Sequence, residues 1–439
     1  MNSVTTRAKA SSASLVLTVV IAGTLLATPL RAQSPTRPSA ADSTRAAADS
    51  ILARLRRAEE AIALLQQQLA EQASSGVATH SRMRLELSGR VLMNVFSNSA
   101  RVNNVDDPQF VRPDTASPLP LSGLGMAIRQ STFGAVLTAN VLGGRFTGDV
   151  DMDFFGGQQP STGGREFPLP RIRTARATVR WTNWELMAGQ ESPLIAGLNP
   201  VSPAAIGTPD FAAAGNLWLW LPQVRATWQT NGSIRVGVQG ALLANITGDA
   251  AGTFDTDFDP AEHTSRPAVE ERVFIRWGED ERTSEIGCGG HLGWIDVAGG
   301  QVQGSAVACD VHISILSGVE LRGEAYGGYG LRGLGGGGIG QNLDRNNNPF
   351  ADQGAWGQLN MDPVSLMRVG AGCGIDAPNQ PIAFAPGGGR LRNASCAGYT
   401  ILRPGGPIFI AGEYRWLQTK YDSGTVSNTH LNLSLGFEF

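Results

Sequence analysis

Hydrophobic and polar residues alternate one by one over most of the chain, from about residue 84 to the C-terminus. The final segment, His430 to Phe439, reads HLNLSLGFEF, with an apolar side chain at every second position. Successive side chains of a β-strand point to opposite faces, so this period of two predicts strands with one apolar and one polar face. A soluble β-sandwich would alternate in the same way. The length and the spacing of the segments decide between the two.

The alternation predicts about sixteen strands, an even number, as expected for bacterial barrels. The predicted strands are 84–96, 127–141, 144–155, 170–181, 183–190, 218–229, 233–245, 269–277, 283–295, 301–316, 318–330, 353–361, 364–376, 391–402, 407–419 and 429–439. Short turns such as Asn231-Gly232 alternate with long polar loops such as 97–126. Short turns at one rim and long loops at the other are typical of barrels that span an outer membrane. We therefore predict an all-β fold, a transmembrane antiparallel β-barrel over 84–439, with a short helical coiled coil before it.

The residues before the barrel follow other patterns. Arg7 and Lys9 precede an apolar stretch, Leu15 to Leu26, which predicts a signal peptide over 1–32 with cleavage after Ala32. A membrane anchor is the alternative, but the stretch is shorter than the ~20 residues that a spanning helix needs. Linkers are expected at 33–45 and 74–83.

Between the two linkers, residues 46–73 contain no glycine and carry apolar residues at alternating spacings of four and three. This is the seam of a heptad repeat. The seam residues are Ile51, Leu55, Ala58, Ile62, Leu65 and Leu69. The pattern predicts a coiled coil, placed in the periplasm because both ends of the barrel fall on the short-turn rim. The alternative is a single amphipathic helix lying on the barrel, since about three heptads are marginal alone.

Composition and motifs exclude several classes of function. The 35 basic and 38 acidic side chains give a net charge of -3, so the chain lacks the excess of basic residues that binding to nucleic acid requires. The Gly-rich run Gly327 to Gly340 is not followed by Gly-Lys-Ser/Thr, which argues against a nucleotide site. No Ser-His-acid order, paired carboxylates or CxxC pair indicates catalysis or a metal centre. We expect neither an enzyme nor a bound cofactor or metal.

The 4 cysteines lie in a chain that we expect to be exported to an oxidising compartment. Cys288 and Cys309 are equally far from the turn between their strands, so the register predicts that they stand opposite each other as a disulfide. Cys373 and Cys396 flank a loop in a similar way and are the second predicted pair. The alternative is reduced thiols that face lipid, because cysteine also behaves as a small hydrophobe.

Charged residues of the predicted strands are expected to line a pore, since a charge that faces hydrocarbon costs a few kcal/mol. Acids that face arginines across water would orient dipolar solutes and bind carboxylates through guanidinium groups. The alternative is a row of cross-strand salt bridges that stiffens the wall. The loop 191–217 is expected to fold inward and narrow the pore. The pore-lining candidates are Arg145, Asp149, Asp151, Asp153, Arg171, Arg173, Asp210, Glu324, Glu413 and Arg415.

Several short motifs occur in an order that resembles one family of channels. They are Arg129 to Gly134 (RQSTFG), Asp153 to Gly156 (DFFG), Arg171 to Arg173 (RIR) followed by Met187 to Gln190 (MAGQ), Leu321 to Tyr326 (LRGEAY) and the C-terminal LSLGFEF. In this order they resemble the trimeric DcaP-like porins of the dicarboxylate-uptake type. The resemblance implies a sixteen-stranded barrel, a periplasmic coiled coil and a homotrimer. The chain departs from the family at Arg176, where an aromatic residue is usual.

These observations together predict an outer-membrane porin for passive diffusion of small hydrophilic solutes, with anionic carboxylates as candidates. The expected partners are outer-membrane lipid, small polar solutes, two further copies of the chain and the barrel-insertion machinery, which would read the C-terminal Phe439. The alternative function is a trimeric tether that holds the outer membrane to a periplasmic layer.

Overall fold

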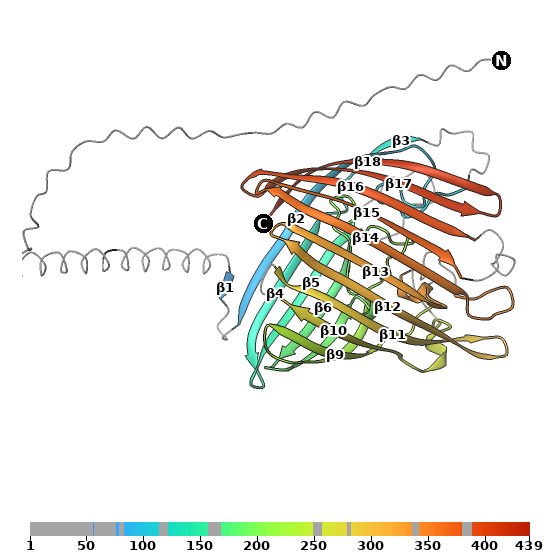
Figure 1. Cartoon of the computed structure of the whole chain (residues 1–439), viewed down its shortest axis with the longest axis horizontal. Coiled ribbons are helices and arrows are strands. Elements are labelled where there is room, and N and C mark those ends of the chain that lie inside the picture. The colour runs from blue at the N-terminus through green and yellow to red at the C-terminus, as the bar shows by residue number, and fades with distance from the viewer. Residues whose placement is uncertain are drawn as a thin grey trace, which may run out of the picture. The chain divides into compact units, whose positions relative to one another are not determined.

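The computed structural model describes residues 56, 76–78, 83–113, 122–156, 168–248, 257–278, 282–335, 342–379 and 389–439. From residue 76 onward these residues form one antiparallel sheet that closes on itself into a barrel (Figure 1). No helix in this part of the chain is long and apolar enough to cross a membrane. The signal peptide, the linker at 33–45 and the coiled coil with its seam lie outside the described residues, apart from residue 56.

The described part of the sheet has 18 strands. They are β1 (Gly76–Ala78), β2 (Arg84–Asn98), β3 (Gly123–Ala127), β4 (Thr132–Val141), β5 (Gly144–Gly156), β6 (Leu169–Arg180), β7 (Trp184–Glu191), β8 (Leu221–Gln229), β9 (Ile234–Leu243), β10 (Ala268–Trp277), β11 (Ser284–Val297), β12 (Gly300–Leu316), β13 (Val319–Tyr329), β14 (Ala351–Val364), β15 (Met367–Pro378), β16 (Arg392–Gly405), β17 (Ile408–Tyr421) and β18 (Gly424–Glu438). Short 3-10 turns in the loops are η1 (Leu194–Ala196), η2 (Glu262–Thr264) and η4 (Arg332–Leu334).

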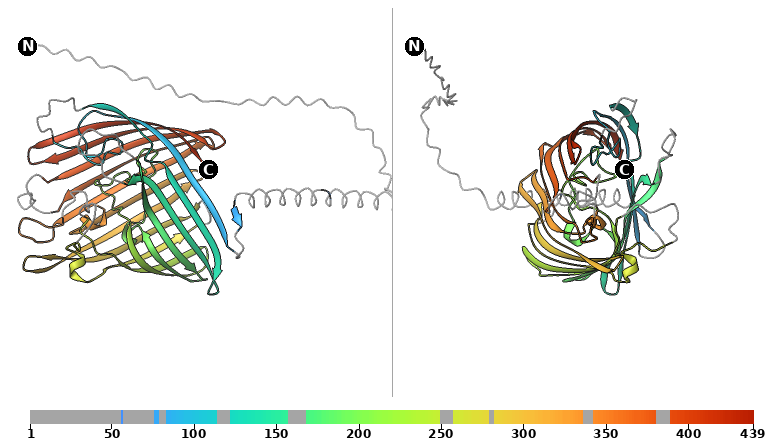
Figure 2. Two further views of the ribbon diagram at one scale, coloured as in Figure 1. Left: turned by 180° about the vertical axis from the view of Figure 1, so that it is seen from behind. Right: turned by 90° about the vertical axis from the view of Figure 1, so that its right-hand side faces the viewer.

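These strands make a closed barrel of 16 positions, which confirms the number predicted from the alternation. β3 and β4 share one position, because β3 pairs with the second half of β2 and β4 with its first half. β1 pairs with the first three residues of β2, Arg84 to Glu86. β18 pairs with β2 and closes the barrel, as the two further views in Figure 2 show.

The segment between β3 and β4 breaks the continuous strand predicted at 127–141, which corrects that prediction. Arg129 and Gln130 leave the ladder here and are buried. Arg129 donates from Nε to Asp106 at 2.7 Å, and Gln130 accepts a hydrogen bond from the backbone N–H of Ile206 at 2.8 Å. Because these two side chains bind loops inside the barrel, the backbone between Ala127 and Thr132 does not pair with β2.

The two rims of the barrel differ as predicted. Short turns such as 142–143 and 317–318 connect strands at one rim, and most connections at the other rim are long loops, with the turn 298–299 between β11 and β12 as an exception. We call residues 99–122 the first loop and residues 192–220 the inward loop. One connection at the long-loop rim is shorter than predicted: β17 and β18 keep pairing up to Tyr421 and Gly424, so the predicted gap between 419 and 429 shrinks to a tight turn.

The strands carry apolar side chains outward and polar side chains inward. On β18, Leu433 is 67% exposed while its neighbours Asn432 and Ser434 are 2% and 3% exposed. An isolated protomer exposes its outer face, so this alternation places the leucine outside and the polar residues in the lumen. An exception on the outer face is Glu271 of β10, which is exposed and stands in register between Gly240 and Gly290.

Both cysteine pairs lie on the outer face of neighbouring strands. Cys288 of β11 stands opposite Cys309 of β12, and the two are joined by a disulfide. Cys373 of β15 stands opposite Cys396 of β16 and is joined to it in the same way. Each bridge links strands that are already adjacent in the ladder, so it reinforces the wall without changing its topology.

Candidate functional site

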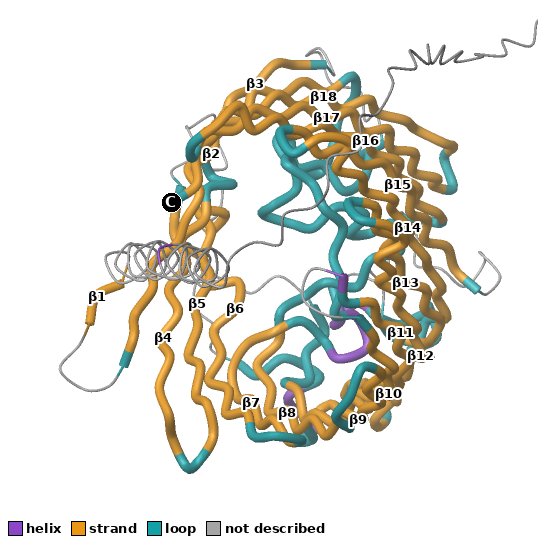
Figure 3. The backbone as a smooth tube through the Cα atoms, turned by 60° about the vertical axis from the view of Figure 1, so that its left-hand side comes forward, coloured by secondary structure: helices purple, strands orange, loops and turns teal. Residues whose placement is uncertain are grey.

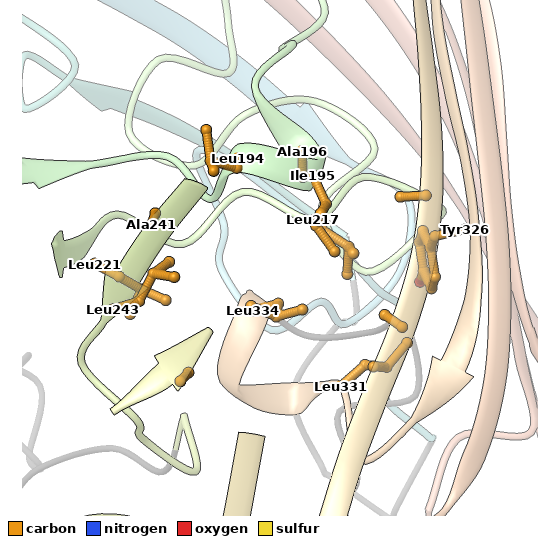
Figure 4. Close-up of a cluster of buried hydrophobic side chains, with 13 residues drawn as sticks. Leu194, Ile195, Ala196, Leu217, Leu221, Ala241, Leu243, Tyr326, Leu331 and Leu334 are labelled. Carbon is orange, nitrogen blue, oxygen red and sulfur yellow. The ribbon is translucent and has the colours of Figure 1, made fainter. Parts of the chain in front are cut away.

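The inward loop connects β7 to β8 and lies inside the barrel. Figure 3 shows this loop and its neighbours within the ring of strands. Both of its ends are buried in a hydrophobic cluster against the wall (Figure 4). The cluster contains Leu194, Ile195, Ala196, Leu217, Leu221, Ala241, Leu243, Ala268, Ala306, Ala308, Tyr326, Leu331 and Leu334. Burial of these side chains holds the loop against β8 to β13, because each buried Leu or Ile contributes roughly 1.5–3 kcal/mol.

Hydrogen bonds fix the middle of the inward loop to strands on the other side of the lumen. Gln358 of β14 accepts from the backbone N–H of Val201 at 2.7 Å and donates to its carbonyl oxygen at 2.8 Å. Asn393 of β16 donates to the carbonyl oxygen of Ala213 at 2.6 Å. Since the loop is attached on both sides, it crosses the lumen and narrows it.

Glycine is required where the inward loop touches β14. Gly215 has a φ of +98°, and a Cβ atom built on it would lie 2.2 Å from the carbonyl oxygen of Ala355. Any larger residue would push the loop away from the wall.

A buried charge cluster joins the two loops to β17. The guanidinium of Arg415 lies 2.7 Å from Glu413, 3.2 Å from Asp210 and 3.4 Å from Asp107. Asp107 also accepts a hydrogen bond from the backbone N–H of Thr208 at 2.8 Å. All four charged side chains are buried. Asp107 belongs to the first loop and Asp210 to the inward loop, so one arginine holds both loops against the wall.

The cluster holds three carboxylates and one guanidinium. Burial raises the pKa of Asp107 to about 7, although Arg415 acts in the opposite direction. Burial also raises the pKa of Asp210 to about 6, and here too Arg415 opposes the shift. Desolvation disfavours the charged form of a carboxyl group more than a single shared cation can repay. The two loop carboxyls therefore take up protons near neutral pH.

A second set of charges forms a ladder between β5 and β6. Arg176 donates from Nε to Asp149 at 2.8 Å, and it also contacts Glu191. The next two steps of the ladder are Arg173 to Asp151 at 3.0 Å and Arg171 to Asp153 at 2.6 Å. Acids and arginines on these strands neutralise one another within the wall. Trp220, at the end of the inward loop, lies 5.4 Å from Arg171 and 5.1 Å from Arg173, measured from ring centroid to guanidinium carbon.

A β-bulge explains how Arg171 and Arg176 share a face although they are an odd number of residues apart. Asp151 pairs with Thr174 but the next residue, Met152, pairs with Ile172, so Arg173 is the extra residue. The bulge shifts the phase of alternation by one. It therefore places Arg176 on the same face as Asp149 and Glu191, which it contacts.

No protein-family model matches the chain. No curated protein matches its sequence. Solved structures do match its fold. The outer-membrane channel DcaP of Acinetobacter baumannii superposes with a TM-score of 0.64 at 16% identity, over 83% of this chain and 100% of that chain. An anion-selective porin from Comamonas acidovorans gives a TM-score of 0.50 at 11% identity, over 81% and 100%. OprB of Pseudomonas putida gives 0.50 at 9% identity, over 84% and 96%.

The chain has the porin fold. At these identities the likeness establishes the barrel architecture, and neither the location of the protein nor its solute.

The other pore-lining candidates lie apart in the porin barrel. Arg145 is exposed beside the turn at 142–143 and stands in register opposite Arg180. Glu324 is 4% exposed and stands opposite Asp310 on β12. The structure thus brings five candidates into the ladder of β5 and β6 and three into the Arg415 cluster, and it leaves Arg145 and Glu324 apart from both. The first group is Asp149, Asp151, Asp153, Arg171 and Arg173, and the second is Asp210, Glu413 and Arg415.

Sequence reasoning did not single out several charged contacts of the lumen. Arg272 of β10 lies 2.6 Å from Asp310 and 2.7 Å from Glu285. Glu320 of β13 lies 3.1 Å from Arg322 and contacts Arg368 of β15. The alternation within these strands could have predicted that these residues face the lumen, because each of them occupies a position opposite in phase to the outer apolar ones.

Asp106 and Asp107 of the first loop were also not singled out, since a loop has no period that would predict where they lie. Among the described residues no group of three or more His, Cys, Asp or Glu side chains could hold a metal ion.

Proposed function

We propose that this chain is an outer-membrane porin, a channel and not an enzyme, through which small hydrophilic solutes diffuse passively. The observation that carries the proposal is the inward loop, which crosses a lumen lined by polar side chains inside a barrel with an apolar outer face. Such a barrel needs a membrane outside and water inside. The fold shared with DcaP supports this assignment.

Conductance tests the proposal directly. Purified full-length protein in planar bilayers should give stable open channels, and a trimer should give them in steps of three. Folded protein that leaves the bilayer silent would contradict it and would favour the tether, whose conduction would be incidental.

We further propose that the lumen prefers small anions such as carboxylates. Arg171 and Arg173 neutralise Asp153 and Asp151, so replacing both arginines with glutamine leaves two uncompensated carboxylates at the inward loop. The reversal potential in a salt gradient should then shift toward cations. The matched control is the neutral pair Arg171→Gln with Asp153→Asn, which changes no net charge. A shift in the control as large as in the double arginine variant would mean that the guanidinium itself binds anions.

Arg225 of β8 allows a second test of anion preference. Its guanidinium donates to neutral acceptors, the side chain of Gln223 and the carbonyl oxygen of Ser192 at 2.8 Å. Arg225→Gln should therefore reduce anion preference without freeing a paired carboxylate.

The proposed assembly is a homotrimer whose coiled coil, 46–73, lies in the periplasm. Its seam residues lie outside the described part of the chain, so the support is the heptad pattern. Deleting 46–73 should weaken the trimer in detergent and leave the barrel folded. Equal resistance to dissociation would mean that the segment is not a trimeric coil. We also propose that Phe439, whose side chain is 59% exposed beside Gly89, is read by the barrel-insertion machinery.

A further inference from the structure

Two cations stand side by side on the outer face of the barrel near its long-loop rim. Arg392 of β16 and Lys420 of β17 are direct partners in the ladder. Their chain neighbours Asn393 and Thr419 are fully buried in the lumen. Because successive side chains of a strand point to opposite faces, Arg392 and Lys420 point outward. The hairpin of β17 and β18 that carries Lys420 is drawn in red in Figure 1.

This outward pair has no acidic partner in the described part of the chain. Arg392 donates from Nη2 to Gln418 at 2.6 Å, and its Nε has no hydrogen-bond partner there. Lys420 is exposed, and none of the ion pairs among the described residues includes it. The acid that follows it in the chain, Asp422, lies in the next turn. Like charges directly opposite each other on neighbouring strands destabilise a sheet, so this arrangement suits an anion that lies between them.

The pair lies at the height of lipid headgroups. On the outer face of β17, apolar Ile410 and aromatic Tyr414 and Trp416 are followed by polar Gln418 and then by Lys420. Aromatic residues mark the border of the hydrocarbon layer. Lys420 is four residues beyond Trp416, which is about 13 Å along a strand and about 10 Å in height for the usual tilt. The headgroup region of a bilayer extends roughly 5–8 Å beyond the hydrocarbon, and long basic side chains reach back toward it.

We propose that Arg392 and Lys420 together bind a phosphate group of a phosphorylated lipid in the outer leaflet. The guanidinium offers two parallel donors to phosphate oxygens, and the ammonium adds a compact charge. The two side chains face the lipid and not the aqueous lumen, so the phosphate belongs to a lipid and not to a solute in transit. The inference rests on the proposed outer-membrane location and is independent of conduction.

Lipid binding is measured with the full-length protein in a neutral detergent by native mass spectrometry. The probes are lipid A with two phosphates, lipid A with one phosphate and uncharged phosphatidylcholine, with inorganic phosphate as a soluble competitor. Wild-type protein should retain the phosphorylated lipids over phosphatidylcholine. The variant Arg392→Gln with Lys420→Gln should lose roughly tenfold in affinity for them, the equivalent of one charge-assisted contact. The charge-preserving variant Arg392→Lys with Lys420→Arg should retain most of it.

The matched control is Arg180→Gln, which removes a cation at the opposite rim. It should bind the lipids as the wild-type protein does. Equal binding by the double Gln variant would overturn the proposal, and so would competition by inorganic phosphate at concentrations similar to the lipid. Dissociation of the trimer in the double Gln variant would mean that a second copy of the chain covers this face. Channel conductance, recorded on the same variants, should be unchanged, so a failure of lipid binding is distinguishable from a failure of the porin function.

Discussion

The carboxylate of Asp107 lies 3.4 Å from the guanidinium of Arg415, so a loop near the start of the barrel is tied to one of its last strands. Asp210 approaches the same guanidinium from the inward loop. The position of both loops in the lumen thus depends on one buried arginine.

Acidification should strengthen the attachment of the two loops. The pKa of Asp107 is raised to about 7 in the folded protein, against 3.8 without burial. Between these values the folded state holds a proton that the unfolded state has lost, so the stability of this region falls as the pH rises from about 4 to about 7. Protection factors for amide hydrogen exchange in the inward loop, which correct for the intrinsic pH dependence of exchange, should be higher at pH 5 than at pH 8, with fewer current fluctuations in single channels.

The control for this prediction is Asp107→Asn, which imitates the protonated acid and should weaken the pH dependence. Adding Asp210→Asn should abolish what remains. Full pH dependence in the double variant would place the titrating group elsewhere.

Replacing Arg415 with glutamine should destabilise the protein strongly. The change leaves Asp107, Asp210 and Glu413 buried without their cation, and removing one partner of a buried ion pair costs about 3–5 kcal/mol. The urea midpoint of unfolding in detergent should fall accordingly. Arg180→Gln breaks an exposed pair with Glu185 and should cost about 0–1 kcal/mol. Similar losses in the two variants would show that the Arg415 cluster contributes little.

Gly215→Ala should open the pore. The new methyl group would collide with the carbonyl of Ala355, and the strain of about 1–3 kcal/mol is relieved when the loop moves away from β14. Single-channel conductance should rise. Gly197→Ala, in the same loop, meets nothing within 4 Å and should leave conductance unchanged. An unaltered Gly215→Ala channel would mean that the loop does not set the constriction.

Glu271→Leu should stabilise the barrel by about 1 kcal/mol, because a carboxylate on the outer face is costly in the hydrocarbon layer. The thermal midpoint in lipid bilayers measures this change. Val273→Leu, on the same face, is the neutral control. A loss of trimer in the Glu271 variant would instead mark this residue as a contact between subunits.

Peptide mapping of unreduced protein should recover Cys288 linked to Cys309 and Cys373 linked to Cys396. Full alkylation without a reductant would mean that the outward thiols stay reduced despite their opposed register.

The barrel could be predicted from sequence because its signal is periodic. Leu433 and Asn432 show the alternation, and sixteen strands follow from repeating it along the chain. The break at Arg129 and Gln130 could not be predicted, since it depends on loops that are distant in sequence. The bulge at Arg173 was hidden for a related reason: an extra residue reverses the phase without changing the composition of the strand.

Prediction of the site was less complete. Glu413 and Arg415 stand on a strand whose outer residues are apolar, so their inward direction follows from the period. Asp107 lies in a loop, which has no periodic pattern that would predict the direction of its side chain. Its role arises only when the first loop meets the inward loop, which is a property of tertiary structure.

The pairing of β18 with β2, which closes the barrel, affects how the protein folds. Phe439, directly after β18, exchanges both backbone hydrogen bonds with Gly89 near the start of β2. Until β18 has been synthesised and has reached β2, the two strands are open edges, and each is a template for pairing with another unfolded chain. Bringing such distant segments together also carries the largest loop-closure entropy in the sheet. Correct folding of this protein therefore requires that the unpaired edges of β2 and β18 do not pair with other chains before the barrel closes.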